Sequence, residues 1–173
     1  CAYGQILNEE TLSLFEKGVW NIHAGLLPKY RGASPIQSCI LAGETKTGVS
    51  IMKTELGLDS GDILLVEETD IGEKETCGEL SARLSLIGAE AIVKALKTLE
   101  NGDFTLQKQS DDGVQVVRKI GKEQAKIDFS KTANEVVNLV RAMNPEPTAY
   151  SSVNGLKVNV FLAEKCEEFA EEN

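Results

Sequence analysis

Asn21 and His23 are the residues of this sequence whose chemistry is easiest to relate to catalysis, and His23 is the only histidine in the chain. Residues 19–22 predict a short buried strand. Because alternate side chains of a strand point to the same face, the two side chains are expected to lie side by side. A neutral imidazole can accept or deliver a proton, and a carboxamide can orient it or donate a hydrogen bond to a developing oxyanion. The alternative is that His23 is a buried structural residue.

The loop over residues 57–62 holds a second group that could take part in catalysis. Asp59 lies there between Gly57 and Gly61. Two glycines around a carboxylate indicate a tight loop in which the backbone closely approaches another group. An ordinary hairpin turn is the alternative, because aspartate and glycine are common in such turns.

Periodic apolar residues and local capping signals predict the elements that must position these groups. Thr76 opens the longest amphipathic helix with a capping box, and Asn154-Gly155 is a strong hairpin signal. Asn8 and Ser34 are expected to cap two shorter helices. The strand over residues 47–54 alternates apolar with polar residues, which predicts a half-buried strand. Helices are predicted over residues 9–17, 35–42, 76–99 and 130–143, and further strands over 63–68, 104–109, 113–117, 149–153 and 157–162.

The composition limits the class of protein. With 173 residues, of which 42% are hydrophobic, the chain can bury a core, and no apolar run approaches the roughly 20 residues of a membrane helix. We expect a cytoplasmic protein. Four cysteines without a C-x-x-C pair, together with one histidine, make disulfides and structural zinc unexpected. The net charge of -9 argues against a general nucleic-acid-binding surface. The cysteines are Cys1, Cys39, Cys77 and Cys166.

The two ends of the chain look unlike the ends of a domain. The chain begins with Cys1 and continues as the tail of a strand followed by a turn at Gly4. Residues 164–173 are rich in glutamate and predict a solvated segment. We therefore expect the sequence to be a piece of a longer polypeptide.

Three motifs together resemble the signature set of the folate-dependent formyltransferases. They are Asn21-Ile22-His23, the Leu-Leu-Pro-Lys-Tyr-Arg-Gly loop over residues 26–32, and Leu-Asp-Ser-Gly-Asp over residues 58–62. Residues 31–37, 48–52, 125–129 and 141–145 also resemble this family. The resemblance therefore spans nearly the whole chain, and it is specific.

The resemblance implies a reaction and roles for the residues. A formyl group would pass from 10-formyltetrahydrofolate to an amine, without a metal and without a covalent enzyme intermediate. Asn21 and His23 would stabilise the oxyanion, and Asp59 would orient or charge-pair His23 and help to move the proton. The folate site would be lined by Gly25, Leu26, Leu27 and Pro28, with the backbone of residues 59–62.

The resemblance also implies an α/β fold with two parts. Residues 1–105 would be the second half of a Rossmann-like catalytic domain, residues 106–121 a linker, and residues 122–173 the start of a small β-rich, OB-like domain. Half of a parallel sheet would expose an edge and apolar surface, so we expect the 173 residues alone to be poorly soluble or to oligomerise.

The acceptor implied by the resemblance is methionyl-initiator tRNA. The reaction is expected in the cytoplasm or in an organelle with bacterial-type translation initiation. The parent protein is expected to be a monomer that needs no membrane. Gly25 and Glu146 depart from the family, which usually has serine and an aromatic residue there. Acidic residues outnumber basic ones over residues 121–173, so this part lacks the basic stripe expected for tRNA. The alternatives are formyl transfer to another amine, such as glycinamide ribonucleotide or a nucleotide-linked amino sugar, hydrolysis of formyltetrahydrofolate, or a non-catalytic fragment.

Overall fold

A three-stranded sheet carries the Asn21 and His23 strand at one edge. The computed structural model describes residues 7–166, so the predictions for Cys1–Gly4 and for most of the acidic end lie outside the described residues. The elements in chain order are α1 (Glu9–Ser13), β1 (Trp20–His23), β2 (Arg31–Gly32), α2 (Pro35–Leu41), β3 (Lys46–Lys53), β4 (Ile63–Asp70), α3 (Cys77–Asn101), β5 (Val116–Val117), the 3-10 turn η1 (Lys122–Ala125), α4 (Ala133–Ala142), β6 (Ala149–Val153) and β7 (Leu156–Val160).

The sheet has the strand order β1-β3-β4, and both of its strand pairs are antiparallel. The expectation of a parallel sheet is therefore wrong for these strands. For β3 and β4 the reason is their short connection, because parallel neighbours need a crossover of about a dozen residues or more. In the part of the chain that the structure describes, the strands that pair in parallel are β2 and β5.

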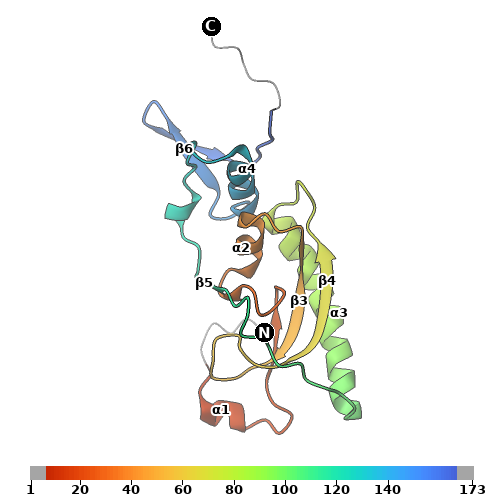
Figure 1. The fold of residues 1–173 in the computed structure, drawn as a ribbon. Coiled ribbons are helices and arrows are strands. Elements are labelled where there is room, and N and C mark those ends of the chain that lie inside the picture. Colours follow the sequence, from red (N-terminus) through yellow and green to blue (C-terminus); the bar gives the residue numbers. More distant parts are fainter. Residues whose placement is uncertain (1–6, 167–173) are drawn as a thin grey trace.

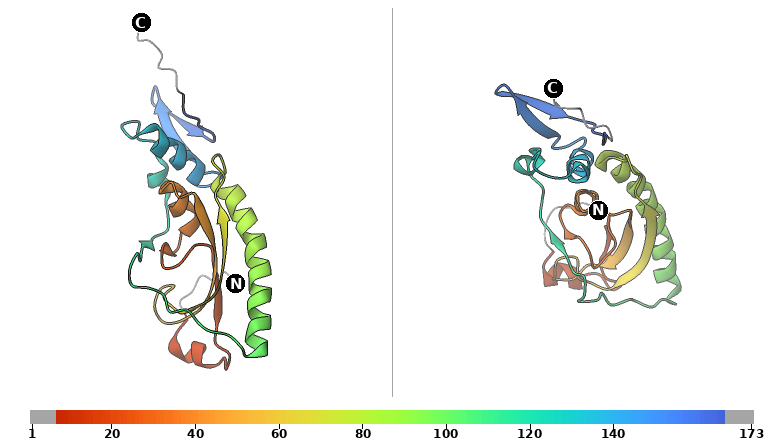
Figure 2. Two further views of the ribbon diagram at one scale, coloured as in Figure 1. Left: turned by 45° about the vertical axis from the view of Figure 1, so that its right-hand side comes forward. Right: turned by 45° about the horizontal axis from the view of Figure 1, so that its top comes forward.

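The central strand β3 is buried along almost its whole length, from Thr47 to Met52. The prediction of a half-buried strand is wrong because both faces of β3 are covered. Figures 1 and 2 show α3 running along one face of the sheet, while α2 and the loop after β1 lie on the other. The edge strand β1 is less buried than predicted, since the side chain of Ile22 is 37% exposed.

The longest predicted helix is confirmed as α3, with 25 residues. Thr76 and Glu79 form the capping box, and Gly102 ends the helix with a φ of 76°. One stripe of α3 packs on the sheet and on α2, whereas Leu86, Val93 and Leu96 are exposed. The buried residues of α3 are Leu80, Leu84, Gly88, Ala91, Ala95 and Leu99.

The two shorter helices differ from their predictions. Asn8 does cap α1, where its side chain accepts a hydrogen bond from the Thr11 N–H, but α1 ends at Ser13 and buries none of its residues. Leu14 and Phe15 are exposed instead of forming an apolar face. Ser34 precedes α2 without capping it, because its hydroxyl accepts a hydrogen bond from the Ile120 N–H.

A second, smaller hydrophobic cluster lies where α4 packs against the β6–β7 hairpin. Thr132 and Glu135 cap α4 with a second capping box. The hairpin turns at Asn154-Gly155 with positive φ at both residues, as predicted. The strands predicted over residues 104–109 and 113–117 are reduced to β5 and one bridge between Ile63 and Gln107. None of the helices in residues 7–166 combines the length and the apolar character needed to cross a membrane.

Candidate active site

Strand β1 places Asn21 and His23 on the same side of the sheet. In the antiparallel pairing with β3, Asn21 lies opposite Met52 and His23 opposite Ser50. His23 is only 4% exposed, whereas Asn21 is half-buried. Asn21 is therefore partly accessible from solvent, and His23 is held inside the protein.

The imidazole of His23 makes different contacts through its two nitrogen atoms. Nε2 lies 3.1 Å from the carbonyl oxygen of Tyr30. Because a carbonyl can only accept, this contact fits the tautomer that carries the proton on Nε2. Nδ1 lies 3.6 Å from Oδ2 of Asp59. The neutral ring therefore presents a free lone pair on Nδ1, on the side where the carboxylate lies.

Asp59 lies on the loop between β3 and β4 in a left-handed backbone conformation, with a φ of 45°. Its Oδ2 accepts a hydrogen bond of 2.8 Å from the Gly32 N–H. Gly61 fits the prediction of a close backbone approach, because a Cβ atom there would lie 1.9 Å from the Lys53 carbonyl oxygen. The loop is thus a turn between adjacent strands that also places Asp59 beside His23.

Burial lowers the pKa of His23 below the ordinary value of 6.5. The negative charge of Asp59 and the hydrogen bond to the Tyr30 carbonyl act in the opposite direction without outweighing burial. An imidazole with a lowered pKa is neutral near physiological pH, so Nδ1 can accept a proton. The same carboxylate favours the imidazolium once that proton has arrived.

The loop after β1 is fastened to the central strand by Ser50. Ser50 is fully buried, and its hydroxyl donates a hydrogen bond of 2.8 Å to the Gly25 carbonyl. The same hydroxyl oxygen accepts a hydrogen bond of 3.4 Å from the Leu27 N–H. A Cβ atom on Gly48 would lie 2.7 Å from Cδ2 of Leu26, so the Leu26 side chain packs on the sheet. The roles predicted for Gly25, Leu26, Leu27 and Pro28 in folate binding remain predictions.

Gly25 lies close to the imidazole of His23 and leaves little room for a side chain. A Cβ atom at this position would lie 3.2 Å from Nε2 of His23 and 3.3 Å from Cβ of Pro35. A side chain at this position would therefore press on both the ring and the first residue of α2.

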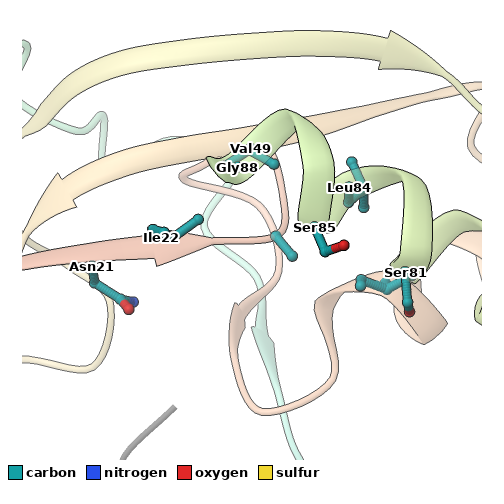
Figure 3. Close-up of a pocket in the computed structure, with 9 residues that line it drawn as sticks. Asn21, Ile22, Val49, Ser81, Leu84, Ser85 and Gly88 are labelled. Carbon is teal, nitrogen blue, oxygen red and sulfur yellow. The ribbon is translucent and has the colours of Figure 1, made fainter. Parts of the chain in front are cut away.

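A pocket of about 420 Å³ opens beside Asn21. Figure 3 shows that β1 and α3 supply most of its wall. Its lining includes Asn21 but neither His23 nor Asp59, so it adjoins the candidate site and does not enclose it. The residues that line it are Asn21, Ile22, Ala24, Ile36, Val49, Ser81, Leu84, Ser85 and Gly88.

The structure adds supporting residues that sequence reasoning did not identify: Tyr30, Ser50 and Gln109. Gln109 lies in the segment predicted as a linker, and its side chain is only 7% exposed. Polar neighbours on both sides concealed it, and no local pattern marks a buried glutamine there. The Tyr30 carbonyl carries no side-chain signal at all.

Cys39 and Cys77 are not among the groups that contact His23 or Asp59 in the described residues. Burial raises the pKa of both Cys39 and Cys77, which keeps them in the unreactive thiol form. Within residues 7–166, no group of three or more potential ligands is placed to hold a metal ion.

Family models place the chain among known proteins. Residues 1–96 match the model described as formyl transferase, and residues 119–173 match the one described as formyl transferase, C-terminal domain. The chain belongs to the formyl transferase family. The division of this formyltransferase chain at residues 105 and 121 remains a prediction.

Curated relatives of this formyltransferase chain carry a more specific name. Methionyl-tRNA formyltransferases from Fusobacterium nucleatum and Coxiella burnetii are 43% and 44% identical over 92% and 94% of the chain. The protein of that name from Chromohalobacter salexigens is 45% identical over 94% of the chain. The chain spans about half the length of these curated relatives, namely 50% to 52%.

Solved formyltransferase structures share the fold. The N-formyltransferase from Helicobacter canadensis, in complex with folinic acid and dTDP-3-aminofucose, aligns with a TM-score of 0.82 at 25% identity, over 98% of this chain and 62% of that chain. A 4-N formyltransferase from Francisella tularensis aligns with a TM-score of 0.78 at 27% identity, over 94% of this chain and 69% of that chain. These similarities agree with a Rossmann-like domain followed by a β-rich part.

Proposed function

We propose that the protein containing this formyltransferase chain transfers a formyl group from 10-formyltetrahydrofolate to the amino group of methionyl-initiator tRNA. The observation that carries the proposal is the pairing of His23 with Asp59, in which Nδ1 and Oδ2 are 3.6 Å apart while the Tyr30 carbonyl occupies Nε2. The proposed acceptor is supported by relatives at 43% to 45% identity that are named for this reaction.

His23 would act through Nδ1. The amine nitrogen would bond to the formyl carbon of the donor, and the bond from that carbon to N10 would break. The proton that the amine loses would pass to N10 of the tetrahydrofolate that leaves. The lowered pKa of His23 leaves Nδ1 free to accept that proton, directly or through water. The Asp59 carboxylate then offsets the positive charge on the ring. Nε2 remains bonded to the Tyr30 carbonyl, which keeps the ring in one orientation.

Asn21 would supply the donor for the oxygen that becomes negative during transfer. Its side chain lies on the same side of β1 as His23 and is partly accessible. A preorganised amide donor costs no reorganisation when the charge develops. Amide, imidazole and carboxylate thus meet the needs of acyl transfer to an amine, and no covalent intermediate and no metal are required.

The folate site is proposed to include Gly25, Leu26, Leu27 and Pro28, together with the backbone of residues 59–62. Ser50 fixes the first segment through the Gly25 carbonyl, and Gln109 fixes the second through the carbonyls of Asp59 and Gly61. Both segments are held by these hydrogen bonds and lie beside His23, which supports the proposal. Leu26 would contribute by supporting the loop from the sheet side.

We propose, as the resemblance to the family implies, that the protein acts as a monomer and without a membrane. It would act where initiator tRNA is used, in the cytoplasm or in an organelle with bacterial-type translation initiation.

A formylation assay with an acceptor panel tests this function. The protein is incubated with 10-formyltetrahydrofolate and methionyl-initiator tRNA, methionyl-elongator tRNA or a dTDP-linked amino sugar. We expect rapid formylation of the initiator tRNA alone. Formylation of the amino sugar instead would move the protein to the second candidate function, which the similarity to the Helicobacter canadensis structure favours. Release of formate without any acceptor would indicate a hydrolase.

A further inference from the structure

Gln109 lies outside the motifs that resemble the family, yet both polar atoms of its side chain hydrogen-bond to the loops beside His23. Its Oε1 accepts hydrogen bonds of 2.9 and 2.7 Å from Nε and Nη2 of Arg31. Its Nε2 donates hydrogen bonds of 2.9 Å to the Asp59 carbonyl and 2.7 Å to the Gly61 carbonyl. One buried amide thus ties together the two loops that flank His23.

Only a carboxamide suits this position. The guanidinium of Arg31 requires an acceptor, and the two carbonyl oxygens require a donor. An ionised glutamate offers acceptors only, and an aliphatic side chain offers neither. Because Gln109 is 7% exposed, water cannot readily replace these partners.

The bonds of Gln109 act on a residue that needs support. Asp59 is held in the left-handed region, which aspartate adopts less readily than glycine. Its side chain is fixed by the Gly32 N–H, and its carbonyl is fixed by Gln109. Arg31, which directly precedes Gly32, is held by the same glutamine. The carbonyl anchor of Asp59 is therefore Gln109 itself, and Gln109 also supports the Gly32 anchor, which the β2–β5 pairing holds as well.

We propose that Gln109 is a positioning residue that holds the Asp59 carboxylate beside Nδ1 of His23. It touches neither the ring nor the reacting atoms, so it acts through Asp59. The segment around residue 109 is thereby part of the catalytic apparatus. This inference rests on the proposed function for its kinetic consequences, but its geometric content is independent of the acceptor.

The first test compares Gln109→Met with Gln107→Met in the whole protein that contains this chain. Both changes replace glutamine by a neutral side chain of similar length, but Gln107 is exposed and lies two residues away. We expect Gln109→Met to lower kcat about 10- to 100-fold, since a misplacement of about 1 Å can cost 100-fold, with a smaller change in KM. Gln107→Met should match the wild type. Equal kcat values for all three proteins would overturn the proposal.

A second variant separates the two arms of the amide. Gln109→Glu keeps an acceptor for Arg31 but cannot donate to the Asp59 carbonyl, so it should lose as much kcat as Gln109→Met. Full kcat in Gln109→Glu would assign the effect to Arg31 and contradict the proposal. In an Asp59→Asn background, Gln109→Met should cost less than threefold, because residues acting as one unit are not additive. An undiminished loss in that background would also contradict it.

A spectroscopic measurement keeps the proposal testable when a variant or the wild type is inactive. The pKa of His23 is measured by NMR, with the resonance assigned by its loss in His23→Gln. Gln109→Met should lower the pKa further, because a displaced carboxylate no longer favours the imidazolium. An unchanged pKa would overturn the positioning role. Absence of formyl transfer in the wild type would instead overturn the proposed function while leaving this measurement valid.

Discussion

Nδ1 of His23 lies 3.6 Å from Oδ2 of Asp59. His23 is on the edge strand β1 and Asp59 is on the loop after β3, so the whole of β3 lies between them in the sequence. The distance is longer than a direct hydrogen bond but short enough for a strong electrostatic interaction in a buried site. Burial lowers the pKa of the imidazole, and the carboxylate partly offsets that effect. The pair therefore combines a neutral resting ring with a stabilised protonated state.

Replacement of His23 tests the central assignment. We expect His23→Ala to lower the turnover of formyl transfer by about two or more orders of magnitude, the scale of losing a general acid-base or oxyanion group. Turnover is measured in the protein that contains this chain, and urea unfolding shows that the variant is folded. Undiminished turnover would return His23 to a structural role.

Removal of the charge on Asp59 should act through the histidine. Asp59→Asn keeps the size of the side chain but removes the charge that raises the pKa of His23. We expect a lower pKa of His23 by NMR titration and a fall in kcat of about 10- to 1000-fold, the range for acid-base and electrostatic groups. Asp103→Asn removes a charge from an exposed residue and serves as the control. A histidine that titrates identically in both variants would rule out the coupling.

The pH dependence of stability follows from the direction of the same shift. Because the folded pKa of His23 is below the unfolded value of about 6.5, the unfolded chain binds more protons between the two values. The free energy of unfolding should therefore decrease as pH falls below about 6.5, by at most about 1.4 kcal/mol per pH unit. The decrease should stop below the folded pKa.

Urea unfolding between about pH 7.5 and about pH 5.5 measures this dependence. Hydrogen bonds from Lys29 and Arg83 lower the pKa values of Glu44 and Glu75 respectively. The stability that these two carboxylates contribute is therefore lost at a pH below the measured window. His23→Gln should flatten the curve in the measured window. An equally steep curve in that variant would assign the dependence to other groups.

Gly32 is required where two distant segments meet. Its φ is 113°, and a Cβ atom there would lie 2.3 Å from the Val117 carbonyl oxygen in the β2–β5 pair. We expect Gly32→Ala to lower the free energy of unfolding by about 1–3 kcal/mol beyond the cost of the backbone conformation itself. Gly113→Ala is the matched control, because Gly113 has a φ of 78° and no atom within 4 Å of a built Cβ. Equal decreases in the free energy of unfolding for the two variants would mean that the close approach of Gly32 to Val117 does not contribute to stability.

Arg141 connects α4 to the loop before α3. Its Nε and Nη2 each donate a hydrogen bond of 3.0 Å, to the Glu75 and Gly72 carbonyls respectively. Lysine cannot reproduce this fork, so Arg141→Lys should lower the free energy of unfolding by about 1.5–3 kcal/mol. Arg118→Lys, at an exposed position, should have little effect in the same urea titration. An equally large decrease in the free energy of unfolding for Arg118→Lys would contradict a stabilising role for the two hydrogen bonds of Arg141.

Local signals in the sequence predicted the elements that local energetics govern. The capping box at Thr76, the stop at Gly102 and the turn at Asn154-Gly155 were all predicted correctly. These features depend on residues within one turn of each other, so the sequence alone specifies them. The alternation in β3 failed as a guide because burial depends on what covers each face, and α3 and α2 cover both.

The sequence by itself determined the chemical groups of the site: one imidazole, one amide on the same side of a strand, and one carboxylate on a glycine-rich loop. The tertiary structure alone decided which atoms meet. It places the Tyr30 carbonyl on Nε2, Asp59 beside Nδ1, and Gln109 behind Asp59. The physical reason is that these contacts join segments far apart in the chain, and their geometry is set by sheet pairing and loop packing, which leave no local pattern in the sequence.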